Sequence, residues 1–391
     1  MNAVYDHLVA IIFVGVLFVG TIVVVPAAMS YTTSQAVDQQ QMRNTALNVF
    51  NAFLQGTGSP LDWGSPFPFD QNQVKTFGLA SAQQFSSYVL DPDKVQRLDP
   101  SSPYNITYSY ARNLLNLNGY GFQFSLYRPF IVDWDIQWSN VTNNVVLSVN
   151  VTRTEDGTPI PNALVKATII STAIGKLDKN QTAIQISEIA PDATTNILGS
   201  AVISKTVNVA EGYALDKAIA IMHITVTGMD TMVIASRDSL AQDCLKITTF
   251  GDTVALTFWD NAYYNGSVPN GARWIEGIYG YDLQNLMTLY TGGQTVNDAK
   301  INNGAGEYDT WSMNFPGLRA MNPGMLIFVL NVPLKGTGRT LLVVAGPFSF
   351  DSSDKIFRFG GDANSNVLAQ IRRFVVISGM TYVAELDLWR E

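Results

Sequence analysis

An uninterrupted apolar run near the N-terminus is the feature that most constrains how this chain can fold. Residues 8–25 read LVAIIFVGVLFVGTIVVV, and no charged residue occurs between Leu8 and Val37. Roughly 20 apolar residues cross the hydrocarbon core of a membrane, and a single segment pairs its peptide groups there only as a helix. The run therefore predicts a helix that faces lipid or packs among other helices. The residues predicted to make these contacts are Leu8, Ile11, Ile12, Val16, Val19, Val23 and Pro26.

Two alternatives for this run are a cleaved secretory signal and a buried helix of a globular core. A signal would begin with basic residues and have a shorter apolar core. The segment before Leu8 is MNAVYDH, without Lys or Arg, although residues 26–30 could serve as a cleavage region. A globular core helix would be less uniformly apolar. We therefore expect an anchor.

The helix is expected to continue beyond the apolar run. A polar stretch follows Ser30, and then apolar residues recur at helical spacing and form one face. These residues are Ala46, Leu47, Phe50, Phe53 and Leu54. Gly56, Gly58 and Pro60 would end the helix. A single helix from Leu8 to about Gln55 would span roughly 70 Å, with a kink or its exit from lipid at Pro26. Further helices are expected around 80–89 and 108–117.

Composition favours an exported protein rich in β-structure and excludes nucleic-acid binding. Only 14% of the residues are charged, whereas about a quarter is usual, and Asn, Thr, Ser and Gln recur throughout. The net charge is −8 and no basic cluster occurs, so phosphates would find no partner. Cys244 is the single cysteine, which excludes an intrachain disulfide and is expected to be a small buried apolar residue.

Sequons favour an orientation with the short N-terminus inside the cell and the rest outside. The positive-inside rule does not apply, because neither flank of the apolar run is basic. The N-x-[ST] pattern of N-glycosylation occurs at Asn105, Asn140, Asn150, Asn180 and Asn265, all beyond the apolar run. These five residues are candidates for N-glycans, and the protein is expected at the cell surface.

The segment from Asp133 to Ser236 resembles an immunoglobulin-like β-sandwich. VDWDIQW alternates polar and apolar residues as a half-buried strand does, and an Asp156-Gly157 turn follows the next strand. The stretch DGTPIPNALVKATII is similar to surface-repeat and carboxypeptidase-regulatory modules, which act as spacers and adhesive units. Residues 241–391 contain further strand-like runs, and RRFVVISGMTYVAELDLW predicts a hairpin that turns at Ser378-Gly379.

The first 130 residues or so resemble a type IV pilin or pilin-like protein. A short N-terminus precedes the long apolar helix with a proline in its second half, and an amphipathic extension and a β-rich head follow. AVDQQQMRNTALNVFNAFL, GSPLDWGS and TFGLA are similar to archaeal surface proteins with such N-termini. The resemblance implies that the helices of many copies pack together and that Asp6 neutralises the N-terminal amine of a neighbour. Pilin precursors carry a basic leader that ends in Gly before the apolar run, and none is present here. Either the sequence begins at the mature end, or the similarity is only that of any anchored helix.

Patterns for chemistry are weak. His7 and His223 are too few for a histidine metal site or a catalytic triad. Asp133 and Asp135 share a strand face as a glycosidase pair would, but a solvated face is the simpler explanation. Residues 362–366 begin like a calcium loop without its glycine and distant Glu. An aromatic group could contact sugar or form core: Trp259, Tyr263, Tyr264, Trp274, Tyr279 and Tyr281.

These observations predict a mainly β protein with a long N-terminal α-helix, built from a pilin-like helix and immunoglobulin-like sandwich domains. The expected divisions are a membrane or filament-core helix with its amphipathic extension at 1–60, a small α/β head at 61–130, a sandwich at 131–240 and a C-terminal β-rich domain at 241–391. The expected function is that of a structural subunit of an extracellular filament or surface assembly, without enzymatic activity or cofactor. The alternative is a monomeric, membrane-anchored adhesion or binding protein. Expected partners are the membrane, further copies of the chain and N-glycans.

Overall fold

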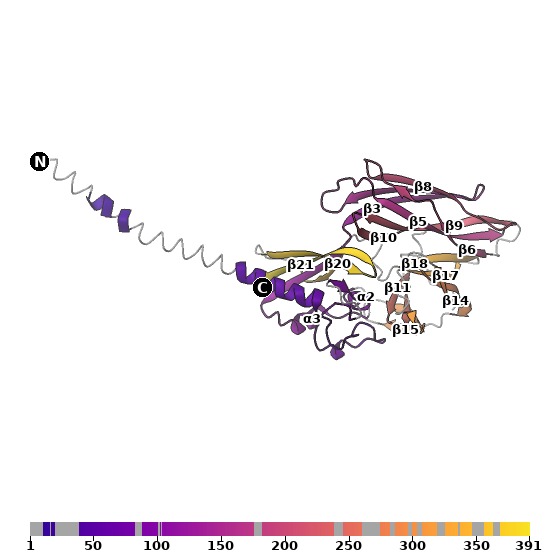
Figure 1. Cartoon of the computed structure of the whole chain (residues 1–391). Coiled ribbons are helices and arrows are strands. Elements are labelled where there is room, and N and C mark those ends of the chain that lie inside the picture. Colours follow the sequence, from indigo (N-terminus) through magenta and orange to yellow (C-terminus); the bar gives the residue numbers. More distant parts are fainter. Residues whose placement is uncertain are drawn as a thin grey trace.

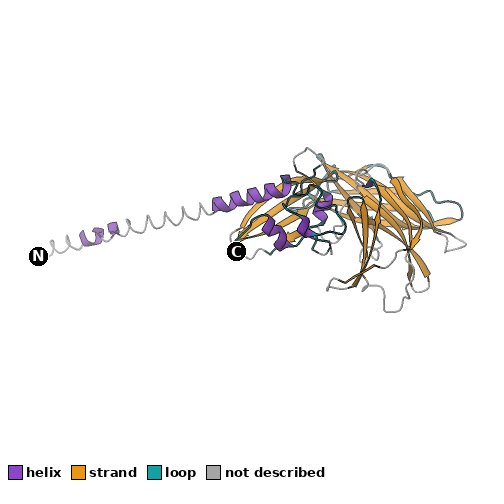
Figure 2. Cartoon of the chain, turned by 90° about the horizontal axis from the view of Figure 1, so that it is seen from below, coloured by secondary structure: helices purple, strands orange, loops and turns teal. Residues whose placement is uncertain are grey.

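The computed structural model describes residues 11–15, 17–19, 39–82, 88–100, 102, 104–175, 182–237, 245–259, 274–281, 286–295, 299–302, 307–318, 325–334, 337–345, 356–362 and 368–391. Within them the protein is mainly β, with several antiparallel sheets and few, short helices (Figures 1 and 2). The prediction of a β-rich protein is confirmed. The expected long helix is described in three pieces, at 11–15, 17–19 and 39–55, of which the last is the longest.

A five-stranded sheet forms the head, next to the helix at 39–55. Its strands, in spatial order, are β1 (Val89–Leu90), β20 (Leu368–Ile377), β21 (Met380–Arg390), β2 (Tyr120–Tyr127) and β19 (Ile356–Gly360). All neighbours are antiparallel except β1 and β20. Residues 120–127 thus pair with residues 383–390. The sheet therefore joins the region expected as a small head to the end of the region expected as a C-terminal domain.

The predicted hairpin at the C-terminus is confirmed. Ile377 pairs with Met380, which leaves a two-residue turn. Ser378 and Gly379 both adopt positive φ, 49° and 81°. Two central residues of positive φ are what a type I′ turn needs, because its twist matches that of the flanking strands.

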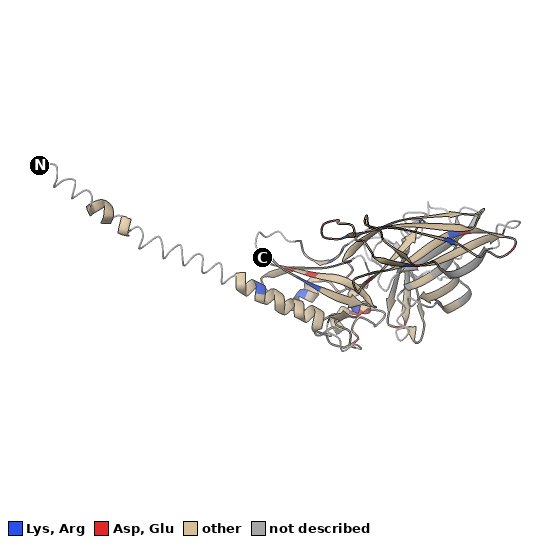
Figure 3. Cartoon of the chain, turned by 45° about the horizontal axis from the view of Figure 1, so that its top comes forward, with Lys and Arg blue, Asp and Glu red and all other residues tan. Residues whose placement is uncertain are grey.

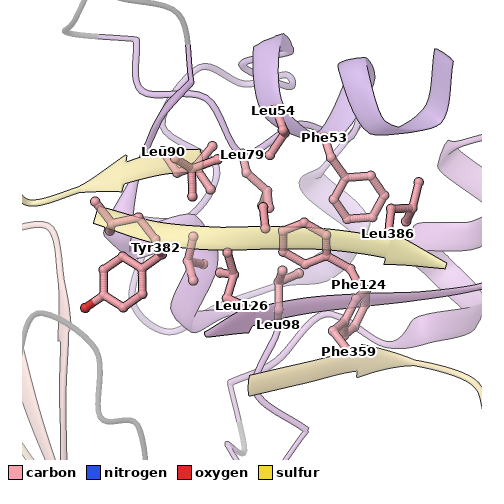
Figure 4. Close-up of a cluster of buried hydrophobic side chains, with 14 of the residues drawn as sticks. Phe53, Leu54, Leu79, Leu90, Leu98, Phe124, Leu126, Phe359, Tyr382 and Leu386 are labelled. Carbon is pink, nitrogen blue, oxygen red and sulfur yellow. The ribbon is translucent and has the colours of Figure 1, made fainter. Parts of the chain in front are cut away.

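The helix at 39–55 packs its predicted apolar face on this sheet (Figure 4). Phe53 stacks on Phe124 with ring centroids 4.9 Å apart and meets Phe122 edge to face at 5.5 Å. Beyond Gly56 the chain returns along the helix end, where the Leu79 N–H donates to the carbonyl of Phe53 at 2.9 Å. The sheet and this return segment thereby fix the direction of the helix.

Short helices surround this core. They are the 3₁₀ turn η1 (Gln71–Gln73), α2 (Pro92–Gln96) and α3 (Tyr108–Leu114). The helix expected around 108–117 is therefore confirmed in α3. The prediction of a helix around 80–89 is wrong for the described residues at each end of that range, which are extended. Ala80 bridges Leu90 in extended conformation and Val89 begins β1, because the backbone groups there pair with neighbouring strands.

Two sheets packed face to face make up residues 130–236. One contains β3 (Phe130–Ser139), β4 (Asn144–Arg153) and β8 (Ser200–Thr206). The other contains β10 (Met229–Ser236), β9 (Tyr213–Val226), β5 (Leu164–Gly175) and β6 (Thr182–Ile189), with β7 (Ala193–Thr194) paired to β5. Inward side chains of both sheets share one apolar core, among them Ile136, Leu147 and Val165. The alternation predicted for VDWDIQW is thus confirmed in β3.

Two further four-stranded sheets lie between this sandwich and β19 in the chain. The first is β11 (Leu245–Phe250), β12 (Thr253–Trp259), β16 (Glu307–Asn314) and β15 (Ala299–Asn302). The second is β14 (Leu286–Thr295), β13 (Trp274–Tyr281), β17 (Met325–Leu334) and β18 (Thr337–Ala345). Figure 1 shows these strands beside the head sheet and below the sandwich.

Strand β9 has both faces buried and thereby ties the parts together. Ala220 and Met222 face the sandwich core, whereas Ile219 and Ile221 face a second core. That second core also contains residues of the head sheet and of β13, such as Tyr279. A strand buried on both faces has no need of polar alternation, which explains the continuous apolar run at 218–222.

Candidate functional site

The apolar N-terminal segment presents its side chains to the surroundings. Residues 11–15 and 17–19 are helical and lie apart from the β-sheets (Figure 1). Ile11, Ile12 and Val19 are 69%, 58% and 62% exposed, and Phe13 and Phe18 are similar. Leu8, Val16, Val23, Pro26 and Asp6 lie outside the described residues. No helix among the described residues is both long and apolar enough to span a membrane.

Charged side chains are sparse across the described surface (Figure 3). On the head sheet, Glu385 of β21 accepts hydrogen bonds from the Tyr127 hydroxyl at 3.1 Å and from the Gln370 amide at 2.9 Å, and it pairs with Arg372. Burial of the phenol and the charge of Glu385 raise the pKa of Tyr127 to about 12. This network therefore stabilises a neutral Tyr127.

Below the helix, a buried cation holds the loop at 57–66 in place. Arg97 follows α2 and is fully buried. Its guanidinium donates to the carbonyl oxygens of Gly64 at 2.8 Å, Pro66 at 2.6 Å and Tyr104 at 3.1 Å. It also lies over the ring of Phe250, 3.6 Å from the centroid. Burial lowers the pKa of Arg97 to about 9, against the influence of Asp93, so the group is still a cation at neutral pH.

Lys94, on α2 itself, has the same role on the other side of the loop. Its ammonium is buried and donates to the carbonyl oxygens of Thr57 at 2.7 Å and Ala80 at 2.9 Å, with Asp91 at 3.9 Å. Gly64 lies so close to α2 that an added Cβ would be 2.5 Å from the backbone nitrogen of Lys94. The loop therefore fits only with glycine at that position.

The remaining polar residues of α2 join the head to β11. Asp93 accepts from the Ser65 hydroxyl at 2.8 Å and from the Gly251 N–H at 2.9 Å. Gln96 donates to the Thr249 carbonyl at 3.0 Å and accepts from the Thr249 N–H at 3.2 Å. The Arg97 guanidinium and the Lys94 ammonium donate to backbone carbonyl oxygens of the loops around α2. We therefore regard α2 and Arg97 as a structural joint.

Sequence reasoning missed this joint. In the run DPDKVQR, Asp91 caps α2 by accepting from the Asp93 N–H, and Pro92 occupies its first turn. Asp-Pro before a short polar stretch does predict a helix start. Alternating charges, however, are typical of a solvated segment, and no local pattern indicates that Lys94 and Arg97 are buried.

Three of the five sequons are described. Asn140 is exposed in the turn between β3 and β4. Asn105 is half-buried and its amide donates to the Pro100 carbonyl at 3.3 Å. Asn150 is half-buried in β4 and accepts from the Ser200 hydroxyl at 3.2 Å. Asn180 and Asn265 lie outside the described residues.

The weak chemical patterns resolve into structural roles where they are described. Asp133 and Asp135 lie on the exposed face of β3, and Asp135 pairs with Arg237 at 2.7 Å, as a solvated strand face would. Tyr281 is buried, and its hydroxyl lies 2.7 Å from the Thr168 hydroxyl.

The other candidates that the structure describes are not brought together in one site. Tyr279 is buried in the core, and Asp362 is exposed. His223 lies 3.2 Å from Asp230. The described residues contain no cluster of three or more His, Cys, Asp or Glu side chains that could hold a metal ion. The residues that lie outside the described part, or whose side chains do, are His7, Cys244, Trp259, Tyr263, Tyr264, Trp274, Asn364 and Asn366.

Comparisons with known proteins do not define a class for this chain. No protein-family model and no curated protein matches it. Among solved structures, a similar chain is MtrC from Shewanella baltica OS185, at 8% identity over 55% of this chain and 68% of that one, with a TM-score of 0.18. A similarity at this level carries no argument about fold or function.

Proposed function

We propose that the protein is a structural subunit of an extracellular filament or surface assembly, anchored and polymerised through its N-terminal apolar helix. The observation that carries this proposal is a contrast along the helical sequence. The apolar face of residues 39–55 is covered by the head sheet, whereas Ile11, Phe13 and Val19 of the earlier segment are 69%, 67% and 62% exposed. Exposure of apolar surface to water costs about 25 cal/mol per Å², so this segment needs an apolar partner.

The head supports the same reading. An amphipathic helix laid on a mostly antiparallel sheet, with an apolar helical segment earlier in the chain, resembles the arrangement of pilins. The two-layered unit at 130–236 resembles an immunoglobulin-like sandwich, which we propose as an outward spacer or adhesive module. The double burial of β9 makes this module continuous with the head, so movement of the helix would carry the sandwich with it.

An anchored monomer is the second candidate, because lipid covers apolar side chains as well as neighbouring helices do. In that case the β-domains would bind a ligand or partner at the cell surface. Both candidates require the same orientation. Protease added to intact cells should remove the β-domains and leave a small membrane fragment. If the β-domains are digested only after lysis, the orientation is the reverse of the proposed one.

A pair of matched variants tests whether the apolar segment drives association. Phe13→Asp places a carboxylate in the segment, and Ile197→Asp places one at another large, exposed apolar side chain, in the sandwich. A charge at the centre of a membrane helix costs roughly 2.5–3.5 kcal/mol. Phe13→Asp should lose both membrane association and sedimentable polymers, whereas Ile197→Asp should behave as wild type. Equal behaviour of the two variants would refute the proposal.

A substitution of Asp6 helps to distinguish the filament from the anchored monomer. In a filament core, its carboxylate is expected to pair with the N-terminal amine of a neighbouring copy, and removal of one partner of a buried pair costs roughly 3–5 kcal/mol. Asp6→Ala should therefore accumulate in the membrane with folded β-domains but form no filaments by electron microscopy. Normal assembly of this variant would refute the pairing role of Asp6 and leave the filament standing, whereas a wild type that never forms polymers would leave the anchored monomer as the function.

A further inference from the structure

The exposed side of the helix at 39–55 is almost free of charge. Seven of its eight exposed residues are Asn or Gln, and Arg43 is the eighth. A helix face that serves only to meet water usually carries charged residues of both signs. Five of the amides form what we call the amide stripe: Gln41, Asn44, Asn48, Asn51 and Gln55.

The spacing within the amide stripe alternates between three and four residues. An average of 3.5 keeps the five side chains in one nearly straight row, which is the repeat of helices that pack along their length. At about 100° per residue, this row lies opposite Ala46, Phe50 and Phe53, which the sheet covers. The helix therefore has one apolar face for its own head and one amide face directed away from it.

We propose that the amide stripe packs against the same helix of a second copy of this chain. This inference rests on the proposed filament, in which packing of the apolar segments would bring identical helices together. Identical copies place like side chains next to one another, so carboxylates or ammonium groups would repel. An amide carries both donors and acceptors and can pair with its own kind. Such pairs specify register at some cost in stability, as a buried Asn does in coiled coils.

The existing contacts leave the amide stripe available for a partner. Gln40 donates to Asn44 at 3.2 Å within the helix, and Gln55 donates to the Tyr88 hydroxyl at 3.4 Å. These are long hydrogen bonds between exposed groups, and amides can exchange such bonds for intermolecular ones. At 17 residues, the helix offers a contact of roughly 25 Å in length.

Two charge variants of the full-length protein test the inference. The double variant Asn48→Asp, Asn51→Asp adds charge to the amide stripe with almost no change in shape. Arg43→Glu produces the same change in net charge on the same helix, outside the stripe. The double variant should raise the critical concentration for assembly by roughly tenfold or more, and about 1 M salt should largely reverse this because it shortens the Debye length to about 3 Å. Arg43→Glu should assemble as wild type, and thermal unfolding should be unchanged in both.

Cross-linking locates the contact directly. Asn48→Cys and Arg43→Cys, each in a Cys244→Ser background, are treated with a short bismaleimide in the assembled state. Asn48→Cys should give multimers and Arg43→Cys should not. If the wild type assembles but Asn48→Cys gives no multimers, or the double Asp variant assembles normally, the amide stripe inference fails and the filament stands. If the wild type never assembles, the filament proposal itself fails and the inference falls with it.

Discussion

Replacement of Arg97 by Met should greatly reduce the free energy of unfolding of the protein. Arg97 is fully buried, and its guanidinium donates to three carbonyl oxygens at 2.6–3.1 Å. Methionine would keep the apolar packing of the stem but leave those carbonyls without their donor. Hydrogen bonds to charged groups contribute about 1.5–3 kcal/mol each, and partial relaxation recovers some of this. We expect a loss of about 3–5 kcal/mol in the free energy of unfolding.

Equilibrium urea unfolding measures this loss, and limited proteolysis at residues 57–66 reports whether the loop is released. Arg112→Met is the matched control. Arg112 makes a bidentate ion pair with Glu391 at 2.5 and 2.9 Å, but the two side chains are 25% and 43% exposed. Pairs of this kind contribute about 0–1 kcal/mol. Arg97→Lys should fall between the two, because an ammonium cannot reach all three carbonyls. If Arg97→Met loses no more than Arg112→Met, the loop is held by something other than the buried cation.

Three further predictions follow from the fold. Ile221→Ala and Met222→Ala should each cost about 2–5 kcal/mol, but only Ile221→Ala should make the link between head and sandwich sensitive to protease. Equal sensitivity would contradict the two-faced burial of β9. Because the fold favours the neutral phenol of Tyr127, stability should be intact below its ordinary pKa of 10.0 and fall as the pH rises toward about 12. Tyr127→Phe should flatten that fall in urea unfolding. By mass spectrometry in a glycosylating host, Asn140 should be occupied more fully than Asn105, whose amide already donates within the protein, and the reverse order would refute this.

Local sequence patterns were sufficient to predict those features that depend only on neighbouring residues. The hairpin at Ser378-Gly379 followed from two apolar runs around a turn that tolerates positive φ. The amphipathic face around Phe50 and Phe53 followed from helical spacing alone. Similarly, alternation in β3 predicted which of its residues face the core, since the side-chain period of a strand is a local property.

The pairing of distant segments was beyond local reasoning. Strand β2 ends at Tyr127 and its partner β21 begins at Met380, and no local pattern in either strand indicates that the two pair. Helical expectation failed around Ala80 because the extended segment there gains its hydrogen bonds from neighbouring chain, not from its own residues. The role of Arg97 was likewise hidden, because its burial depends on the carbonyl groups of Gly64, Pro66 and Tyr104, which only the folded chain brings together.

By itself, then, the sequence determined the apolar N-terminal run, the amphipathic helix after it, the wealth of strands and the low charge, because composition and periodicity are properties of short windows. Tertiary structure alone decided that the last strands complete the head sheet, that β9 is buried on both faces, and that α2 joins the head to β11. These depend on which surfaces meet after the chain has folded. The same distinction holds for the amide stripe: its spacing is written in the sequence, but only the sheet that covers the opposite face shows which side of the helix is left open.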